Sequence, residues 1–323
     1  MLRVALIAAV GLLAAGAVWA QDPAAGYPSR PVRWIIPFTP GASNDILGRL
    51  VAGKLTEQLG QQFIIDNRPG AGGIVGAETV ARANPDGYTL LLTNPGPSVN
   101  NILLRKNPPY RMSDFTPIVW MGYAPFYVMA GLSFPPRTAR EIVDYAKANP
   151  GKISWASSGM GSGPHIALAV FQLSTGINVT HVPYKGTVQP LIDMVGGQIQ
   201  LLSTTTVSAE AQIKAGRIKV LAVQAKKRTA VMPQIPTLEE QGIKNAEAIV
   251  WFGMSAPAKT PRPILEKLNR EVNKALQLAD VKQRLDQLGL EIEGGTAEKF
   301  DAFIKSQAAR LTDLIKAGAV QVE

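Results

Sequence analysis

Apolar runs and polar, glycine-rich segments alternate along most of the chain. Three short apolar runs, at residues 32–38, 63–66 and 88–94, are nearly continuous, as in parallel strands that are covered on both faces. Between the first two, apolar residues recur with helical spacing until Gly60, a common helix end. These residues are Ile46, Leu47, Leu50, Val51, Leu55 and Leu59. The alternation predicts an α/β fold with parallel sheets.

A second region of the same kind begins near Phe126. Thr138 and Glu141 are spaced as a capping box at the start of a helix, which Pro150 and Gly151 end. Strands are predicted at residues 152–159, 178–184, 198–204, 218–225 and 248–256, and three helical segments follow. We find no repeat at a solenoid period. In parallel sheets, ligands sit beyond the carboxyl ends of the strands, and here those ends carry small polar loops.

The first twenty residues differ from the rest. After Arg3 no charged residue occurs from Val4 to Ala20, and small residues precede Gln21. This pattern predicts a secretory signal peptide over residues 1–20, cleaved after Ala20. The apolar stretch is short for a membrane-spanning helix, which needs about 20 residues. We therefore expect a soluble protein in the bacterial periplasm, where disulfides are optional.

Composition narrows the chemistry. The 323 residues include no cysteine, which excludes disulfides, thiolate zinc sites and cysteine nucleophiles. With only two histidines, His165 and His181, a multi-histidine metal site is not expected either. The net charge is +9, but the basic residues are scattered. This charge favours small anionic ligands or an acidic partner. We expect no cofactor, no metal and no nucleic acid.

The segment DNRPGAGGIVGAE, residues 66–78, raises the question of a nucleotide site. The dinucleotide fingerprint is broken, because Val75 stands at its third glycine position and Gly76 comes one residue late. The segment also lacks the Gly-Lys-Ser/Thr ending of a Walker loop. Its glycines permit tight turns and close backbone approach. The free N–H groups at the start of the following helix suit an anion or the carbonyl group of another loop.

Small polar residues after the predicted strands are the candidates for ligand binding. Ser43 and Asn44 lie at the start of a helix, where N–H donors and the helix dipole favour an anion. Residues 157–165 form a similar helix start in the second region. The predicted ligand-binding residues are Phe38, Gly41, Ala42, Ser43, Asn44, Asp45, Thr93, Ser157, Ser158, Gly161, Ser162, His165, Thr204 and Thr205.

Several of these residues have a simpler interpretation. Ser43 or Asn44 can serve only as a helix cap, and His165 can equally cap its helix or contact a ligand. Asp45 caps its helix or meets a donor of the ligand. His181, in the middle of a predicted strand, is expected to be structural. The β-propensity of threonine explains much of the run from 204 to 206.

Six segments, in this order, carry a family resemblance. They are YPSRPVRWIIPFTPGASNDILGRLVAGKL, NRPGAGGIVGAETVARANPDGYTLL, ISWASSGMGSGPH, HVPYKG, IKAGRIKVLAV and VWFGMSAPAKTP. Together they resemble the substrate receptors of tripartite tricarboxylate transporters, the Bug or TctC-like family. The likeness extends over essentially all of the expected mature chain. It favours a scaffold role for the glycine-rich segment, which is a hallmark of the family.

The resemblance implies a periplasmic-binding-protein fold with two α/β domains, joined by two crossover strands, and a ligand cleft between them. Residues 26–125 and 250–323 would form the first domain and residues 126–249 the second. The hinges would lie near Gly122–Val128 and Ala248–Gly253. It also implies a monomer that holds an organic carboxylate through N–H groups, hydroxyls and waters and delivers it to integral-membrane transporter subunits.

The ligand itself does not follow from the resemblance. The family usually has a glycine where Ala42 stands, and the loop at 201–211 also departs from the family pattern. Phe38, Met160 and Trp251 could flank an apolar ligand body, which favours an aromatic or longer dicarboxylate such as terephthalate. Each of the three is also a plausible core residue.

Three other classes of function are alternatives to the receptor. An enzyme needs a nucleophile with its base or paired carboxylates, but Ser162 is one residue out of register for a G-x-S-x-G elbow. The effector domain of a transcription regulator shares this architecture, but it would carry a helix-turn-helix where this chain has its predicted export signal. A sensor that feeds a signalling partner instead of a transporter stays open.

Overall fold

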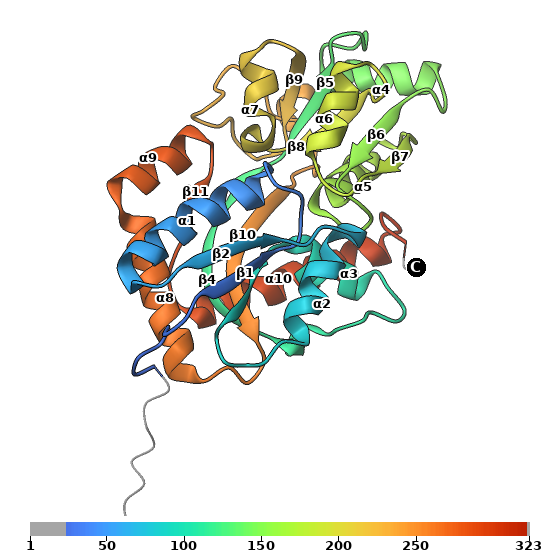
Figure 1. Cartoon of the computed structure of the whole chain (residues 1–323). Helices are drawn as coiled ribbons and strands as arrows, with labels where there is room; N and C mark the ends of the chain where they lie inside the picture. Colours follow the sequence, from blue (N-terminus) through green and yellow to red (C-terminus); the bar gives the residue numbers. More distant parts are fainter. Residues whose placement is uncertain (1–23, 322–323) are drawn as a thin grey trace, which may run out of the picture.

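A computed structural model describes residues 24–321 of the chain. Figure 1 shows two lobes, one of blue, teal and orange-red elements and one of green to yellow elements. Each lobe is built around its own sheet. The predicted signal peptide lies outside the described residues.

The first lobe contains a six-stranded sheet with the order β11-β4-β10-β3-β1-β2. Its strands are β1 (Val32–Ile36), β2 (Phe63–Asn67), β3 (Thr89–Thr93), β4 (Phe115–Pro125), β10 (Ile249–Pro257) and β11 (Glu291–Ile292). Its principal helices are α1 (Ser43–Leu59), α2 (Ile74–Ala81), α8 (Arg262–Gln277), α9 (Ala279–Gln287) and α10 (Ala297–Lys316). The alternating apolar positions form a core in which Trp34, Leu55 and Phe252 are fully buried.

The second lobe contains a five-stranded sheet with the order β7-β6-β8-β5-β9. The strands are β5 (Tyr127–Gly131), β6 (Ser154–Ser157), β7 (Thr180–Pro183), β8 (Leu201–Thr204) and β9 (Ile218–Val223). The helices are α4 (Ala139–Ala148), α5 (Gly163–Thr175), α6 (Val188–Val195) and α7 (Thr206–Lys214). The expected cap begins α4: Thr138 accepts a hydrogen bond from the Glu141 N–H over 3.1 Å, while the Glu141 carboxylate accepts one from the Arg137 N–H over 2.7 Å. Trp155 and Phe171 lie at the centre of this core.

The expected parallel pairing is present in both sheets, but each sheet is mixed. β1 pairs in parallel with β2 and β3, but β10 is antiparallel to both β3 and β4. In the second lobe β6 is parallel to β7 and β8, whereas β5 is antiparallel to β8 and β9. The directions follow from the connectivity. The chain enters the second lobe through β5 and returns to the first lobe through β10, so each of these strands starts at the crossing point and runs against its neighbours. The carboxyl ends of the parallel strands in each sheet therefore face the other lobe.

The crossing point is held by backbone hydrogen bonds between three segments. The Gln224 N–H donates to the Phe126 carbonyl over 2.8 Å, and the Phe126 N–H donates to the Ala248 carbonyl over 3.0 Å. The Ala248 N–H completes the ring at the Gln224 carbonyl, over 2.9 Å. The Gln224 side chain is fully buried and bonds to Ser203 and to the Ala167 carbonyl. The chain thus passes between the lobes at Phe126 and at Ala248–Ile249.

Candidate functional site

A cavity lies between the two lobes and encloses about 420 Å³, its opening to solvent included. Its walls come from both sheets and from the crossover. The lining residues are Phe38, Ala42, Ser43, Asn44, Asn94, Pro95 and Val250 of the first lobe, Phe126, and Ser158, Gly163, Pro164, Thr187, Thr204, Thr205 and Ser208 of the second. None of these residues carries a charge, so any charge in the cavity must come from the ligand.

Four helices begin at this cavity. The residues that precede α1, α5, α6 and α7 are Ala42, Ser162, Thr187 and Thr205. Only Thr205 caps its helix with its own side chain, by accepting a hydrogen bond from the Ser208 N–H. The first N–H groups of a helix have no partner within the helix and carry partial positive charge. Their convergence on one cavity suits an anion.

Buried polar atoms without a partner lie at the same place. Within residues 24–321, the hydroxyl oxygens of Ser162 and Thr187 and the Oδ1 atom of Asn94 have no hydrogen-bond partner. Ser162 is completely buried, and the other two residues are nearly so. A buried polar group without a partner costs free energy. A bound ligand with carboxylate and hydroxyl groups can satisfy these atoms.

The lobes already touch around the cavity. The backbone N–H of Ser43 donates to the Ser208 hydroxyl across the cleft, over 3.1 Å. The Asn100 amide donates to the Gly161 carbonyl over 2.9 Å, which links the segment after β3 to the second lobe. These contacts fix how the donors of the two lobes face one another.

The glycine-rich segment also serves this contact. Gly72 has φ of 65°, and its carbonyl accepts a hydrogen bond from the Asn101 amide over 2.9 Å. A Cβ atom at Gly72 would lie 2.0 Å from the carbonyl oxygen of Met160 in the other lobe. Only glycine permits this approach and this backbone conformation. The carbonyl group of Met160, in a loop of the other lobe, therefore lies directly beside this turn.

Half of the residues predicted to bind ligand line the cavity. They are Phe38, Ala42, Ser43, Asn44, Ser158, Thr204 and Thr205. Ser162 occupies the N-cap position of α5, directly before the lining residue Gly163, but its hydroxyl makes no capping hydrogen bond. Gly41 precedes the lining residues of α1, and its N–H bonds to Asp45 over 3.0 Å. The remaining predicted residues face elsewhere.

Asp45 is turned into the protein. Its carboxylate accepts hydrogen bonds of 3.0 Å from the Gly41 N–H, from Arg49 and from the Asn67 amide. Burial raises the pKa of Asp45, but these hydrogen bonds outweigh it and hold the pKa below its usual value. Its charge is thus paired with Arg49 and directed away from the cavity. Thr93 also points away, and its hydroxyl bonds to Ser255 over 2.6 Å.

His165 and Ser157 belong to a cluster inside the second lobe. His165 stacks on His181 with ring centroids 4.4 Å apart, and its Nδ1 accepts the Gly161 N–H over 3.1 Å. His181 in turn bonds to the Ser157 hydroxyl over 2.6 Å. Burial and the neighbouring His181 lower the pKa of His165 to about 4, and burial lowers the pKa of His181. Both rings are therefore neutral near pH 7, and they shape the loop without contributing a cation.

Several lining residues were missed by sequence reasoning. Asn94 and Pro95 directly precede an irregular helical segment, η2 (Gly96–Asn100) with α3 (Asn101–Leu103), where the sequence predicts a loop. Asn94 donates to Asn44 over 2.8 Å and so orients the pair. Thr187 was passed over in the segment KGTVQ, although a threonine before a helix is a capping signal. Of the three residues proposed to flank an apolar ligand, only Phe38 lines the cavity, and Phe126 is a second aromatic residue in its lining.

The described residues contain no group of three or more His, Asp or Glu side chains placed to hold a metal ion. In the same part of the chain, no helix combines the length and the apolar character needed to cross a membrane.

Two α/β lobes, two crossovers and a cavity between them define the fold of the periplasmic binding proteins. The model of the tripartite tricarboxylate transporter receptor family, TctC, matches residues 47–320. The chain belongs to this family, which confirms the resemblance seen in the sequence. Its members are solute-binding receptors and not enzymes.

Solved structures show how close the likeness is. The periplasmic binding protein BugD is 35% identical with a TM-score of 0.87, over 91% of this chain and 100% of BugD. An R. palustris protein with adipate is 32% identical with a TM-score of 0.88, over 91% of this chain and 99% of that one. MatC from Rhodopseudomonas palustris with bound malate is 30% identical with a TM-score of 0.86, over 90% and 100% of the two chains.

Proposed function

We propose that this receptor captures a small aliphatic dicarboxylate between its lobes and delivers it to the membrane subunits of a tripartite transporter. The observation that carries the proposal is the convergence of four helix N-termini on a cavity lined by uncharged residues. Relatives solved with adipate and with malate support the same ligand class.

The distribution of donors favours an acid with two anionic ends. α1 begins at the cavity from the first lobe, whereas α5, α6 and α7 begin there from the second. One carboxylate can meet the Ser43–Asn44 end of α1 and the other the Ser162 and Thr187 hydroxyls. A ligand that needs both sets binds best when the lobes meet, so binding favours the closed arrangement. We further propose that residues 26–125 with 250–323, and residues 126–249, are the two domains that move.

The setting of this function is also a proposal. We propose that the chain is exported to the periplasm, cleaved after Ala20, and acts as a monomer. The charge-free stretch before Gln21 supports this, as does the periplasmic relative BugD. Intact-mass measurement of the periplasmic protein tests the cleavage, and a species that keeps Met1 in the cytoplasm overturns it.

Calorimetric titration against a matched panel tests the ligand class. The panel contains succinate, malate, adipate, terephthalate, citrate and butyrate. We expect succinate, malate or adipate to bind at least tenfold more tightly than butyrate, because a second charged group gains hydrogen bonds worth about 1.5–3 kcal/mol. Tightest binding of terephthalate would favour the aromatic alternative, for which Phe38 and Phe126 provide the surface. Equal binding of butyrate would contradict the proposal.

Uptake distinguishes a transport receptor from a sensor. Membrane vesicles that contain the cognate transporter subunits should accumulate the labelled acid only when the loaded receptor is added. A receptor that binds the acid but never stimulates uptake would support the signalling alternative.

A further inference from the structure

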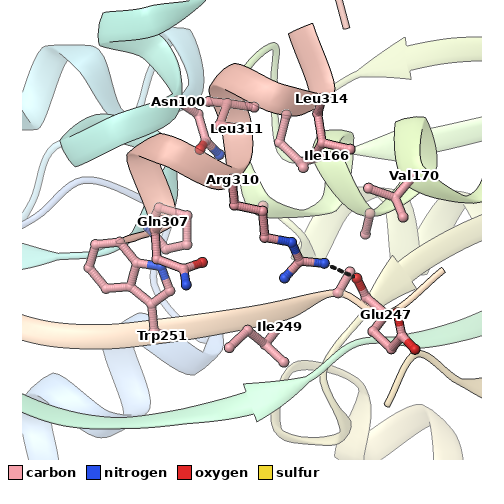
Figure 2. Close-up of a pocket in the computed structure, with 14 residues that line it drawn as sticks. Asn100, Ile166, Val170, Glu247, Ile249, Trp251, Gln307, Arg310, Leu311 and Leu314 are labelled. Atoms are coloured by element: carbon pink, nitrogen blue, oxygen red, sulfur yellow. Dashed lines mark hydrogen bonds between the residues drawn. The ribbon is translucent and has the colours of Figure 1, made fainter. Parts of the chain in front are cut away.

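A second cavity lies beside the ligand cavity, at the crossover between the lobes (Figure 2). It encloses about 480 Å³, its opening included. Helix α10 of the first lobe and helix α5 of the second both line it, with Leu314 beside Ile166, and the strand that carries Ile249 and Trp251 runs below them. Only Pro95 and Gly163 belong to the linings of both cavities. We name it the hinge pocket.

The base of the hinge pocket carries a buried donor without an acceptor. Trp251 is 1% exposed, and in the described part of the chain its indole Nε1–H has no hydrogen-bond partner. Figure 2 shows the indole nitrogen on the side of the ring that faces Gln307 and Arg310. A buried tryptophan N–H usually finds a partner, because leaving it unpaired costs free energy. The donor is therefore available to an acceptor inside the pocket.

A cation stands at the mouth of the same pocket. The Arg310 guanidinium donates one hydrogen bond of 2.8 Å, from Nη2 to the backbone carbonyl of Glu247. It forms no salt bridge with any carboxylate in residues 24–321. A guanidinium has five N–H donors in a planar fork. Its remaining donors and its uncompensated charge suit a carboxylate.

Most of the remaining lining is apolar, and the polar exceptions are Asn100, Gln307 and the acid Glu247. Ile166, Ala167 and Val170 come from α5, Leu311 and Leu314 from α10, and Ile249 from the start of β10. Figure 2 shows Ile166, Val170 and Leu314 grouped on one side of Arg310, with Trp251 and Gln307 on the other. An occupant that fits this division has an anionic head and a short hydrocarbon tail.

We propose that the hinge pocket binds a small amphiphilic monocarboxylate, separately from the dicarboxylate in the cleft. Its carboxylate meets Arg310 and the Trp251 N–H, and its alkyl chain lies against Ile166, Val170 and Leu314. The two cavities differ in chemistry. The cleft offers uncharged donors to two anionic ends, whereas the hinge pocket offers an apolar wall and the Arg310 guanidinium, which bonds to the backbone carbonyl of Glu247 and not to its carboxylate.

Calorimetric titration with hexanoate tests the proposal, with hexan-1-ol as the matched neutral probe. We expect hexanoate to bind the wild-type protein at least tenfold more tightly than hexan-1-ol. Trp251→Phe removes the donor and keeps an aromatic ring, and Arg310→Gln removes the charge from an exposed position. Each should weaken hexanoate binding about tenfold. Both variants should keep wild-type affinity for the tightest dicarboxylate, which also shows that they fold.

Thr187→Val serves as the reciprocal control. Thr187 lines only the cleft, and its hydroxyl has no partner within the described chain, so the isosteric change should not disturb the fold. It should leave hexanoate binding unchanged. Absence of hexanoate binding at 10 mM, or binding that falls in Thr187→Val but not in Arg310→Gln, overturns the proposal. Neither result bears on the dicarboxylate proposal, which the titration against the panel of acids tests separately.

Discussion

The start of α1 and the segment from Ser157 to His165 looked alike in the sequence, but they meet the cavity differently. The start of α1 lines it with Ala42, Ser43 and Asn44. The second segment exposes Ser158 there, while Ser157 and His165 turn to His181. In both, the titratable side chain points away: Asp45 to Arg49, and His165 to His181. Both helix starts thus contribute donors and not charges.

A negative charge placed at the α1 start should have the largest effect. Ser43→Asp puts a carboxylate at a position that is 5% exposed, beside the expected anion. Two like charges about 4 Å apart repel by about 4 kcal/mol at an effective dielectric of 20, which weakens binding roughly a thousandfold. Calorimetric titration with the tightest dicarboxylate measures this, with Ser43→Asn as the uncharged control. Equal losses in both variants would show that charge is not the cause.

The buried pair of His165 and His181 should make the free energy of unfolding depend on pH. The pKa of His165 falls from 6.5 to about 4 on folding, so the unfolded chain binds more protons between these values. Stability therefore decreases as the pH drops from 6.5 to 4, by up to about 3 kcal/mol from this group. Urea unfolding at several pH values measures it. His165→Gln should flatten the profile by that difference, and an unchanged profile would contradict the buried neutral pair.

Loss of one donor from the second lobe should have a smaller effect. Thr187→Val removes a hydroxyl that has no partner in the described residues. Affinity for the dicarboxylate should fall roughly tenfold to a hundredfold, because a hydrogen bond to a charged group is worth about 1.5–3 kcal/mol. The melting temperature without ligand should not change. Thr180→Val, on an exposed strand position, is the matched control. If the two variants bind equally well, the Thr187 hydroxyl does not contact the ligand.

Removal of the paired acid in α1 should affect binding least. Asp45→Asn leaves Arg49 as an unpaired, half-exposed cation on the far side of the helix start. Affinity should rise by less than about fivefold, since partly exposed ion pairs are worth roughly 0–1 kcal/mol. A large loss of affinity would place the Asp45 carboxylate in contact with the ligand, as the sequence first suggested.

The local patterns predicted most of the fold. The apolar runs at 32–38, 63–66 and 88–94 became β1, β2 and β3. β1 and β3 are buried inside the sheet, whereas β2 is an edge strand in which only Phe63 is buried. The direction of β10 was not predictable from its own residues, since it depends on where the chain crosses between lobes. The helical segment after β3 was missed because its prolines and glycines predict a loop. Its conformation depends on Asn100 and Asn101, which bond to Gly161 and Gly72.

The sequence predicted that helix starts form the candidate site, but not which of their side chains face the ligand. Serine, threonine and asparagine before a helix form a local signal, and Ser43, Asn44 and Thr205 do line the cavity. Which side chain of a loop faces the ligand depends on contacts remote in sequence. The sequence shows no partner for His165, but in the structure its ring stacks on that of His181 in β7.

The central claim is that uncharged donors of both lobes hold both carboxylates of one ligand. Calorimetric titration of the tightest dicarboxylate beside its own monoamide and diamide tests it most directly. The three compounds share length and shape, and each amide removes one negative charge. We expect each replacement to weaken binding at least tenfold. A diamide that binds as tightly as the diacid would contradict the account.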